Sequence, residues 1–182
     1  APLRDPEPDD AWAPDGEVDL SAFPSGIQVG DVGPSTARVS VWMGIDEAVI
    51  ALARAEGDRW TEEDVAIAVT RGGVCGQVDL DGLEPDTAYS VVAVAGEMRS
   101  AVTRFRTALP VDGFRKITIG ATSCLAGNRP WPSMSHVAET KPDVFLFLGD
   151  TVYADGANTL DEYRSYWARA LQTQGLVDVT AS

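Results

Sequence analysis

The chain has 182 residues, 45% of them hydrophobic, so it is long enough to bury a core and is not a disordered chain. Its 28 acidic residues outnumber its 14 Lys and Arg residues, and the formal net charge is −14. This negative field repels nucleic acid and anionic membranes, so we expect no nucleic-acid-binding surface. A phosphate ester would also be repelled, and phosphate chemistry in this chain would therefore need metal ions.

Residues 1–20 are rich in Pro and Asp and poor in hydrophobic residues, which predicts an extended arm on the surface. No run approaches the roughly 18 apolar residues of a membrane span, so we expect no transmembrane segment. The chain opens on Ala1-Pro2-Leu3 without Met, which is compatible with the removal of a leader. We expect a secreted, periplasmic or cell-surface protein, although a trimmed chain would look the same.

Residues 21–109 show short runs with period-two alternation, separated by turn residues every eight to twelve positions, which is typical of a β-sandwich. One turn is more specific. Leu83, Pro85, Thr87 and Tyr89 have the spacing of a tyrosine corner, in which a Tyr hydroxyl bonds to the backbone a few residues upstream. We therefore predict an immunoglobulin-like or fibronectin-like domain, with Trp42 in its core and strands at 27–31, 37–42, 49–55, 64–70, 74–80, 88–95 and 100–107.

The pattern changes in residues 110–182. Continuous apolar runs at 116–121 and 143–148 predict strands that are buried on both faces of a sheet. Helical spacing follows each of them, at 132–140 and 160–172. Strand, helix, strand, helix is the first βαβα part of an α/β fold with a parallel sheet. The predicted fold class is thus an all-β sandwich domain followed by the beginning of an α/β domain.

Residues with metal-binding chemistry follow both buried strands. Cys124 comes after the first strand, and Gly149, Asp150 and Tyr153 come after the second. In open α/β sheets ligands bind beyond the carboxyl ends of the strands, so these side chains are candidates for one site. Phenol and thiol groups have ordinary pKa values of about 10 and about 8.5, so a metal that binds both must be strongly Lewis acidic, which favours ferric iron over zinc or magnesium.

Each of these residues also has a structural interpretation. Asp150 could cap the next helix or turn, Cys124 could be a small buried hydrophobic residue or pair with Cys75, and Tyr153 could be a core aromatic. Asn128 and Arg129, in the loop after Cys124, could bind a substrate phosphate or serve only as loop residues.

The spacing of Gly149, Asp150 and Tyr153 matches the G-D-x-x-Y motif of the purple acid phosphatases. The longer layout resembles the PhoD-like alkaline phosphatase and phosphodiesterase family. It includes Phe-Pro-Ser-Gly-Ile-Gln-Val-Gly-Asp at 23–31, Ala-Thr-Ser-Cys at 121–124 and His-Val-Ala-Glu-Thr-Lys-Pro-Asp at 136–143.

The resemblance implies a metallophosphoesterase that hydrolyses phosphate monoesters or diesters. Cys124 and Tyr153 would be ligands of Fe³⁺, and Asp150 would bridge to a second divalent metal, Ca²⁺ first, with Zn²⁺ or Mn²⁺ as alternatives. The metals would polarise the phosphoryl group of the ester. Asp150, Asn128 and Arg129 are the candidate catalytic residues.

The chain departs from the family pattern in its histidines. Family members continue with a Trp-Asp-Asp-His-Glu/Asp segment and later His motifs that complete the metal shell, whereas this chain has one His, His136, which we interpret as structural. We expect the C-terminal remainder of the same enzyme as a second chain, without which this chain is inactive. The alternatives are a shortened form of the enzyme, a domain that has lost catalysis, or a non-catalytic binding or adhesion module.

Overall fold

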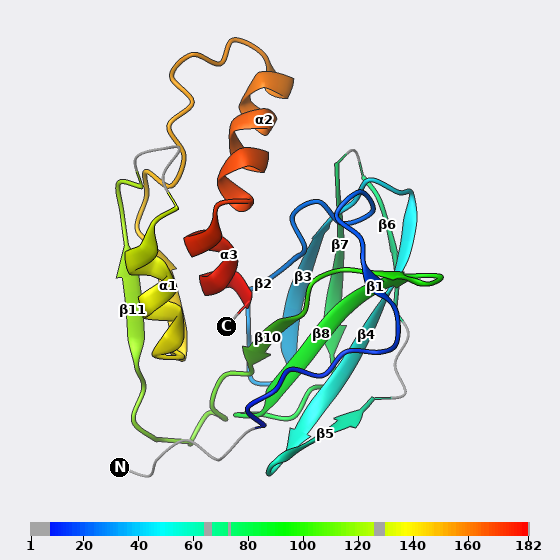
Figure 1. Cartoon of the computed structure of the whole chain (residues 1–182). Coiled ribbons are helices and arrows are strands. Elements are labelled where there is room, and N and C mark those ends of the chain that lie inside the picture. Colours follow the sequence, from blue (N-terminus) through cyan, green and yellow to red (C-terminus); the bar gives the residue numbers. More distant parts are fainter. Residues whose placement is uncertain (1–7, 64–66, 73, 126–129, 182) are drawn as a thin grey trace. The chain divides into compact units, whose positions relative to one another are not determined.

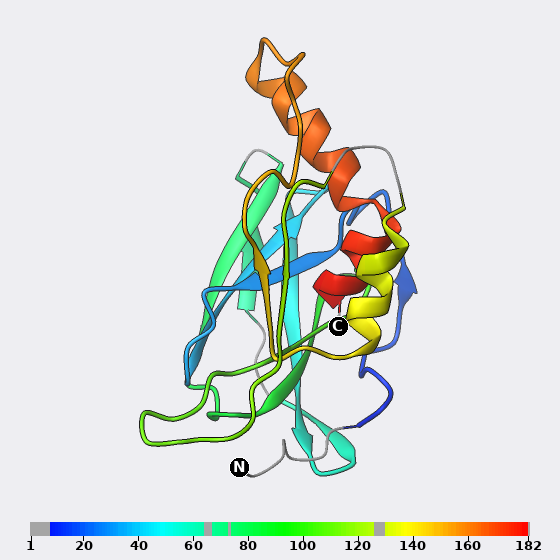
Figure 2. The same cartoon turned by 90° about the vertical axis from the view of Figure 1, so that its left-hand side faces the viewer.

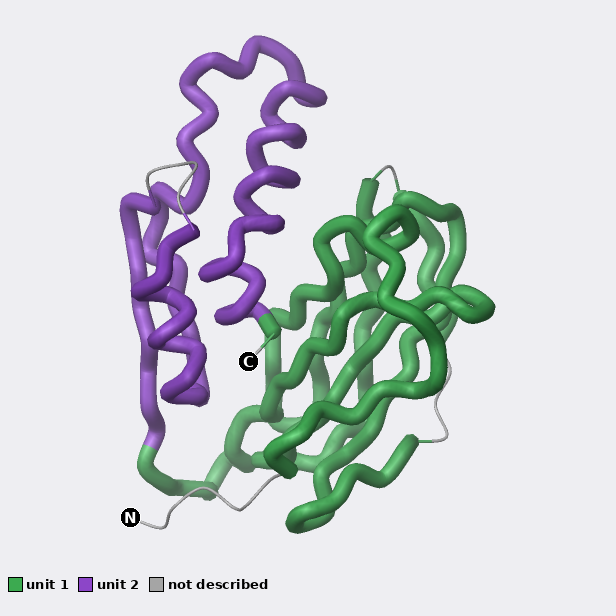
Figure 3. The backbone as a smooth tube through the Cα atoms, in the orientation of Figure 1, with its two compact units in different colours: residues 1–116, 181 green, residues 117–180, 182 purple. Residues whose placement is uncertain are grey.

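The computed structural model describes residues 8–63, 67–72, 74–125 and 130–181 (Figure 1). The chain divides into two compact units. The first comprises residues 1–116 and residue 181, and the second comprises residues 117–180 and residue 182 (Figure 3). None of the helices in the described ranges is long and apolar enough to cross a membrane.

The first unit is a β-sandwich. In the described residues one sheet has the strand order β1-β9-β8-β4-β5, with β10 also paired to β8 and β6 to β4, and the other sheet has the order β2-β3-β7. The strands are β1 (Glu17–Val18), β2 (Ile27–Gly30), β3 (Thr36–Trp42), β4 (Glu47–Glu56), β5 (Arg59–Glu62), β6 (Ile67–Thr70), β7 (Cys75–Asp81), β8 (Ala88–Ala95), β9 (Met98–Arg99) and β10 (Thr103–Arg106).

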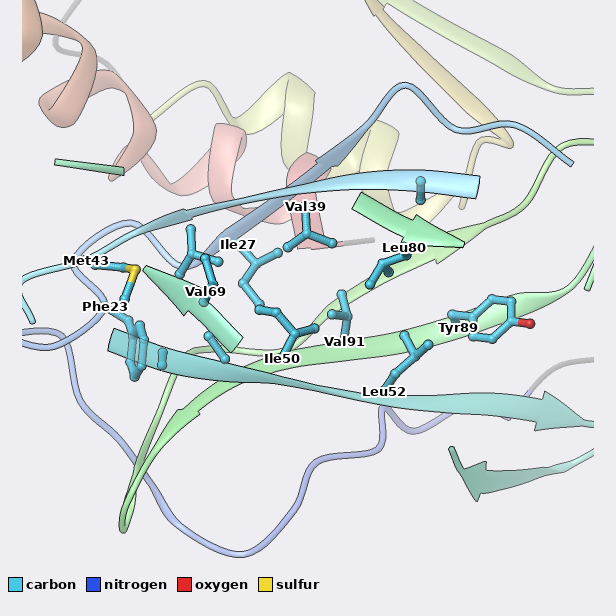
Figure 4. Packing of buried hydrophobic residues seen from close by; sticks show 14 of the residues in the cluster. Phe23, Ile27, Val39, Met43, Ile50, Leu52, Val69, Leu80, Tyr89 and Val91 are labelled. Carbon is cyan, nitrogen blue, oxygen red and sulfur yellow. The ribbon is translucent and has the colours of Figure 1, made fainter. Parts of the chain in front are cut away.

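Alternation along the strands builds the core between the sheets. In β3, Ala37, Val39 and Val41 are buried, while Thr36 and Arg38, whose side chains point to the other face, are exposed. The residues that pack together come from both sheets and include Phe23, Ile27, Ile50, Leu52, Val69, Leu80, Tyr89 and Val91 (Figure 4). Trp42 is only partly buried and lies outside this cluster, so its predicted core position is wrong. The pleat that turns Val41 inward turns Trp42 to the other face.

The tyrosine corner is confirmed. The Tyr89 side chain is almost fully buried, and its hydroxyl oxygen accepts a 2.8 Å hydrogen bond from the backbone N–H of Glu84. Thr107 Oγ1 donates to the Glu84 carbonyl at 2.6 Å and accepts from the Thr87 N–H at 2.9 Å. These bonds fix the turn before β8 to the residue that follows β10.

The described part of the arm, residues 8–20, lies along the sandwich (Figure 1). β1 pairs in parallel with β9, and the buried Ser90 hydroxyl donates a 2.6 Å hydrogen bond to the Trp12 carbonyl. The Trp60 indole N–H donates to the Asp10 carbonyl. The arm therefore obtains its order from the sandwich, because its own composition offers little apolar surface to bury.

The second unit contains β11 (Ile119–Thr122), α1 (Pro132–Glu139), β12 (Val144–Phe147), α2 (Leu160–Leu171) and α3 (Gln174–Ala181). β11 and β12 run side by side and in parallel (Figure 2), with Ile119 opposite Val144 and Thr122 opposite Phe147. The predicted order of strand, helix, strand, helix and the predicted parallel pairing are therefore both present. A Cβ added to Gly120 would lie 3.3 Å from Cγ1 of Val137, which places α1 on the face of the sheet that carries Gly120.

The starts of the helices follow local signals. Pro132 stands in the first turn of α1. At α2, Thr159 and Glu162 form a capping box, in which the Thr159 side chain accepts from the Glu162 N–H and the Glu162 carboxylate accepts from the Thr159 N–H. α3 was not predicted. It begins close to the start of α1, where the Gly175 N–H donates a 2.9 Å hydrogen bond to the Pro130 carbonyl.

Candidate metal centre

The candidate site lies where β11 and β12 end. Because the two strands are parallel, their carboxyl ends meet at one edge of the sheet. Pairing continues past both strands into the following loops. The Leu148 N–H donates to the Thr122 carbonyl at 2.8 Å, and the Leu125 N–H donates to the Asp150 carbonyl at 2.9 Å. The backbone therefore holds the two loops side by side.

Three residues at this edge have positive φ angles: Cys124 at 56°, Gly149 at 111° and Asp150 at 51°. Glycine adopts such angles without strain, whereas Cys and Asp adopt them at a cost of about 1–3 kcal/mol each. Strained residues of this kind are concentrated at functional sites, where the surrounding structure maintains them. Two of the three candidate ligands, Cys124 and Asp150, therefore lie at strained backbone positions.

The side chains of Cys124, Asp150 and Tyr153 converge on one carboxylate oxygen. The Tyr153 hydroxyl donates a 2.9 Å hydrogen bond to Oδ2 of Asp150, and Sγ of Cys124 lies 3.7 Å from the same oxygen. All three residues are exposed. The three residues that we predicted as metal ligands thus lie together, at a place that solvent can reach.

The hydrogen bond to Asp150, with a further contribution from Cys124, raises the pKa of the Tyr153 phenol above its ordinary value. Ionisation would remove the proton that Tyr153 donates to the carboxylate and would place two negative charges side by side. Without a cation at this position, Tyr153 is therefore a neutral hydrogen-bond donor.

The structure contradicts most of the structural interpretations of these residues. Tyr153 is 41% exposed, so it is not a core aromatic. Cys124 is exposed and is a free thiol, so it is neither a buried hydrophobic residue nor half of a disulfide with Cys75, which is also free. Asp150 does not cap the helix that follows, because Thr159 occupies that position.

Asn128, Arg129 and His136 are the other residues that the sequence singled out. Asn128 and Arg129 lie outside the described residues. His136 is exposed on α1, with Nδ1 3.3 Å from the Glu139 carboxylate on the same helix. In the described part of the chain no group of three or more His, Cys, Asp and Glu residues could hold a metal ion. The cluster is therefore a Cys–Asp pair with a tyrosine as its third donor.

The sequence matches no protein-family model and no curated protein. Among solved structures, it is similar to one described as "Structure of PhoD", with a TM-score of 0.74 and 19% sequence identity over 93% of this chain. The chain shares its fold with PhoD. It covers 38% of the PhoD chain, so it spans well under half of that protein's length.

Single sandwich domains also match part of the chain. The FN5 domain of Drosophila Lar matches 53% of this chain and 98% of its own length, with 20% identity and a TM-score of 0.38. The third fibronectin III domain of human KIAA0343 protein matches 59% of this chain and 100% of its own length, with 16% identity and a TM-score of 0.34.

The donor set of the site fits a ferric ion. Thiolate, carboxylate and phenolate would supply three anionic donors, and a cation of high charge is the one that best offsets the cost of ionising Cys124 and Tyr153. The convergence of both side chains on Oδ2 of Asp150 shows that the three donors can approach a common point. Further ligands would have to come from solvent or from residues outside the described set.

Proposed function

We propose that the chain supplies one side of a dinuclear metal site in an enzyme that hydrolyses phosphate monoesters or diesters, an alkaline phosphatase of the PhoD type. The observation that carries the proposal is the convergence of Cys124, Asp150 and Tyr153 at the carboxyl ends of two parallel strands. The fold shared with PhoD supports it. In this proposal the second unit is the beginning of a metallophosphoesterase α/β domain.

The residues of the chain would have separate roles. Cys124 and Tyr153 would hold Fe³⁺, and Asp150, with two carboxylate oxygens, would hold the same ion and reach the second metal, with Ca²⁺ the first candidate and Zn²⁺ or Mn²⁺ next. When bound, these ions would supply Lewis acidity toward the phosphoryl oxygens of the ester. Asn128 and Arg129 would donate hydrogen bonds to the phosphate and orient it.

The proposal includes a second polypeptide. The described residues bring three donors together, whereas a dinuclear site needs more ligands than three residues supply. We propose that the C-terminal remainder of the enzyme, as a second chain, provides them and that the 182-residue chain alone is inactive. We also propose that the enzyme lies outside the cytoplasm. Fractionation of cells that produce the tagged protein would test this.

The deciding experiment compares Asp150→Asn with Asp155→Asn in the complete assembly. Asp155 is exposed and lies in a turn after the site, so its variant changes charge equally and serves as the control. We expect Asp150→Asn to lower iron content and the kcat/KM for 4-nitrophenyl phosphate and bis(4-nitrophenyl) phosphate at least about 100-fold, and Asp155→Asn to leave both near the wild-type values. Iron and activity that survive Asp150→Asn would favour the rival function, a non-catalytic binding or adhesion module.

A further inference from the structure

The larger sheet of the sandwich is buried on the face that points away from the core as well as on its inner face. Residues of β8 alternate between the two faces, and Tyr89 and Val91 belong to the core cluster. Ser90 and Val92 point the other way, yet both are 0% exposed. Ala53 of β4, the register partner of Ser90, is also 0% exposed. We call this side of β4, β8 and β10 the outer face.

The described part of the arm, residues 8–20, covers the outer face. It crosses in front of β4 and β8 (Figure 1), and the Ser90 hydroxyl donates to the Trp12 carbonyl. Val49, farther along the same face of β4, is 38% exposed, so the burial is confined to one part of the face. Among the described residues the core cluster contains none from 8–20. The arm is thus an addition to a sandwich whose core closes without it.

The sheet holds the arm by the carbonyl groups of its backbone. Four side chains, each from a different strand, donate hydrogen bonds to carbonyls in residues 8–16. The donors are Trp60 of β5, Ser90 of β8, Arg99 of β9 and Arg104 of β10, and the acceptors are the carbonyls of Pro8, Asp9, Asp10, Trp12 and Gly16. Contacts of this kind tolerate proline, which lacks an N–H but keeps its carbonyl, and Pro8 is itself an acceptor.

Charge favours the same contact. Residues 8–20 carry five carboxylates and no Lys or Arg, in a chain whose net charge is −14. Most of the surface of such a chain repels an acidic segment. Two of the four donors, Arg99 and Arg104, are guanidinium groups, so the border of the outer face attracts it instead.

We propose that the outer face is a binding site for an extended, acidic, proline-containing peptide of another polypeptide, and that the arm occupies this site as a displaceable ligand from the same chain. Other domains recognise extended proline-containing peptides on surfaces that carry aromatic residues, and Trp60 supplies such a residue here. The site lies wholly in the first unit, so this inference does not rest on the proposed function.

The arm is weakly enough held to be displaced. Its strand, β1, has two residues, and Trp12 is only partly buried. A second copy of the chain offers the same arm and no additional contact. It therefore does not displace the arm below the effective concentration of a tethered segment, which is about millimolar. A peptide of another polypeptide that makes further contacts does displace it.

The test measures the binding of a fluorescein-labelled peptide with the sequence of residues 8–20 to the 182-residue chain, by fluorescence anisotropy. The double variant Trp12→Ala/Glu17→Pro weakens the arm, because it removes the indole ring and the N–H that donates to the Glu97 carbonyl. We expect this variant to bind the peptide at least about tenfold more tightly than the wild type, in which the arm competes. A peptide with Lys in place of every Asp should bind at least about tenfold more weakly.

Ser90→Ala locates the binding site, and Ser40→Ala is its matched control. Ser40 lies on β3 of the smaller sheet, where its hydroxyl accepts a 3.0 Å hydrogen bond from the Gln77 side chain. In the arm-weakened variant Ser90→Ala should lower the affinity for the peptide at least about fivefold, and Ser40→Ala should leave it unchanged. Trp60→Phe removes the other neutral donor at a partly exposed position, so it gives the same test without a change in the buried face.

Hydrogen exchange of the wild type tests whether the arm leaves the sheet. The amides of residues 9–17 should exchange at least about 100-fold faster than those of β4 and β8. Equally slow exchange would show that the arm is a permanent part of the sandwich and would overturn the proposal. So would an arm-weakened variant that binds no peptide, or binding that neither Ser90→Ala nor Trp60→Phe weakens. A wild-type dimer at micromolar concentration that Trp12→Ala/Glu17→Pro abolishes would instead make a second copy the occupant.

Discussion

The Tyr153 hydroxyl donates a 2.9 Å hydrogen bond to Oδ2 of Asp150, the oxygen that also lies 3.7 Å from Sγ of Cys124. A strand-to-loop aspartate is common in α/β proteins, and alone it says little about function. The contact with a phenol three residues later and the approach of a thiol from the neighbouring loop are the features that single out this aspartate. The phenol and the thiol are also the groups that would give a ferric site its colour.

The Tyr153→Phe variant tests the phenol directly. Since a phenolate bound to Fe³⁺ gives a charge-transfer band in the visible, we expect the assembly purified with iron to be coloured and Tyr153→Phe to lose the band. Iron content should fall about tenfold or more as well. Tyr163→Phe is the control, because Tyr163 is an exposed tyrosine on α2, and its spectrum should match the wild type. A band that persists in Tyr153→Phe would remove Tyr153 from the ligand set.

Gly149 provides a test of the backbone at the same edge. Its φ angle of 111° is accessible to glycine and strained for any residue with a Cβ. We expect Gly149→Ala to lower the opening free energy of the β11 and β12 amides by about 1–3 kcal/mol, measured by hydrogen exchange, and to reduce iron binding.

Gly30→Ala is the control for Gly149→Ala. A Cβ at Gly30 meets no atom within 4 Å, and the residue lacks a positive φ angle. Its effect on stability should stay within about 0.5–1 kcal/mol in either direction. Equal effects of the two variants on the β11 and β12 amides would show that the positive φ angle at position 149 does not require glycine.

Tyr89→Phe tests the corner of the sandwich. The variant leaves the ring in place but removes the acceptor of the Glu84 N–H. We expect a loss of about 1–2 kcal/mol in the free energy of unfolding and a Tm lower by a few degrees. Tyr163→Phe, which removes an exposed hydroxyl, should change Tm by less than about 1 °C. A Tyr89→Phe protein as stable as the wild type would mean that water replaces the hydroxyl at no cost.

Much of the fold could be predicted from the sequence because its signals are local. Alternation predicted β3 and β8 to within one residue, and continuous apolar runs predicted strands at the places of β11 and β12. The prediction that these two strands are buried on both faces is wrong, because Ile119, Val144 and Leu146 are exposed. The elements that were missed lack such signals. β5 (Arg59–Glu62) is mostly polar, and β1 and β9 are two-residue strands. β1 exists because the arm pairs with β9, which itself pairs with β8. α3 depends on the close approach of Gly175 to Pro130, a contact between segments far apart in sequence.

The site was predicted from residue types and from the rule that parallel strands end at one edge. Sequence reasoning placed Cys124 and Asp150 after neighbouring strands, but it could not show that both adopt positive φ angles, because these follow from the pairing of the two loops. It also left open a disulfide or a buried position for Cys124. The exposure of Cys124 excludes the buried position, and both cysteines are free thiols in the structure. Neither property can be read from the local sequence, because both depend on how distant segments pack.

The two cysteines give a prediction with a defined pH dependence. Cys75 is partly buried, and desolvation raises the pKa of its thiol, whereas Cys124 is exposed. Thiolate is the reactive form, so at pH 7 to 8 a maleimide should label Cys124 first and Cys75 slowly, with labelling of Cys75 accelerating as pH rises beyond the ordinary thiol range. Because the raised pKa favours the neutral thiol in the folded state, this group stabilises the fold at low pH, and that contribution is lost as pH rises through the folded pKa.

Labelling without a reductant, followed by mass spectrometry of the tryptic peptides, measures both rates, and the Cys75→Ser and Cys124→Ser variants assign them. Iron bound at the proposed site should protect Cys124 and leave Cys75 unchanged, since a thiolate held by a metal is not free to attack the maleimide. Labelling of both residues only after reduction would instead show a Cys75–Cys124 disulfide. That result would exclude Cys124 as an iron ligand and leave Asp150 and Tyr153 without their third donor.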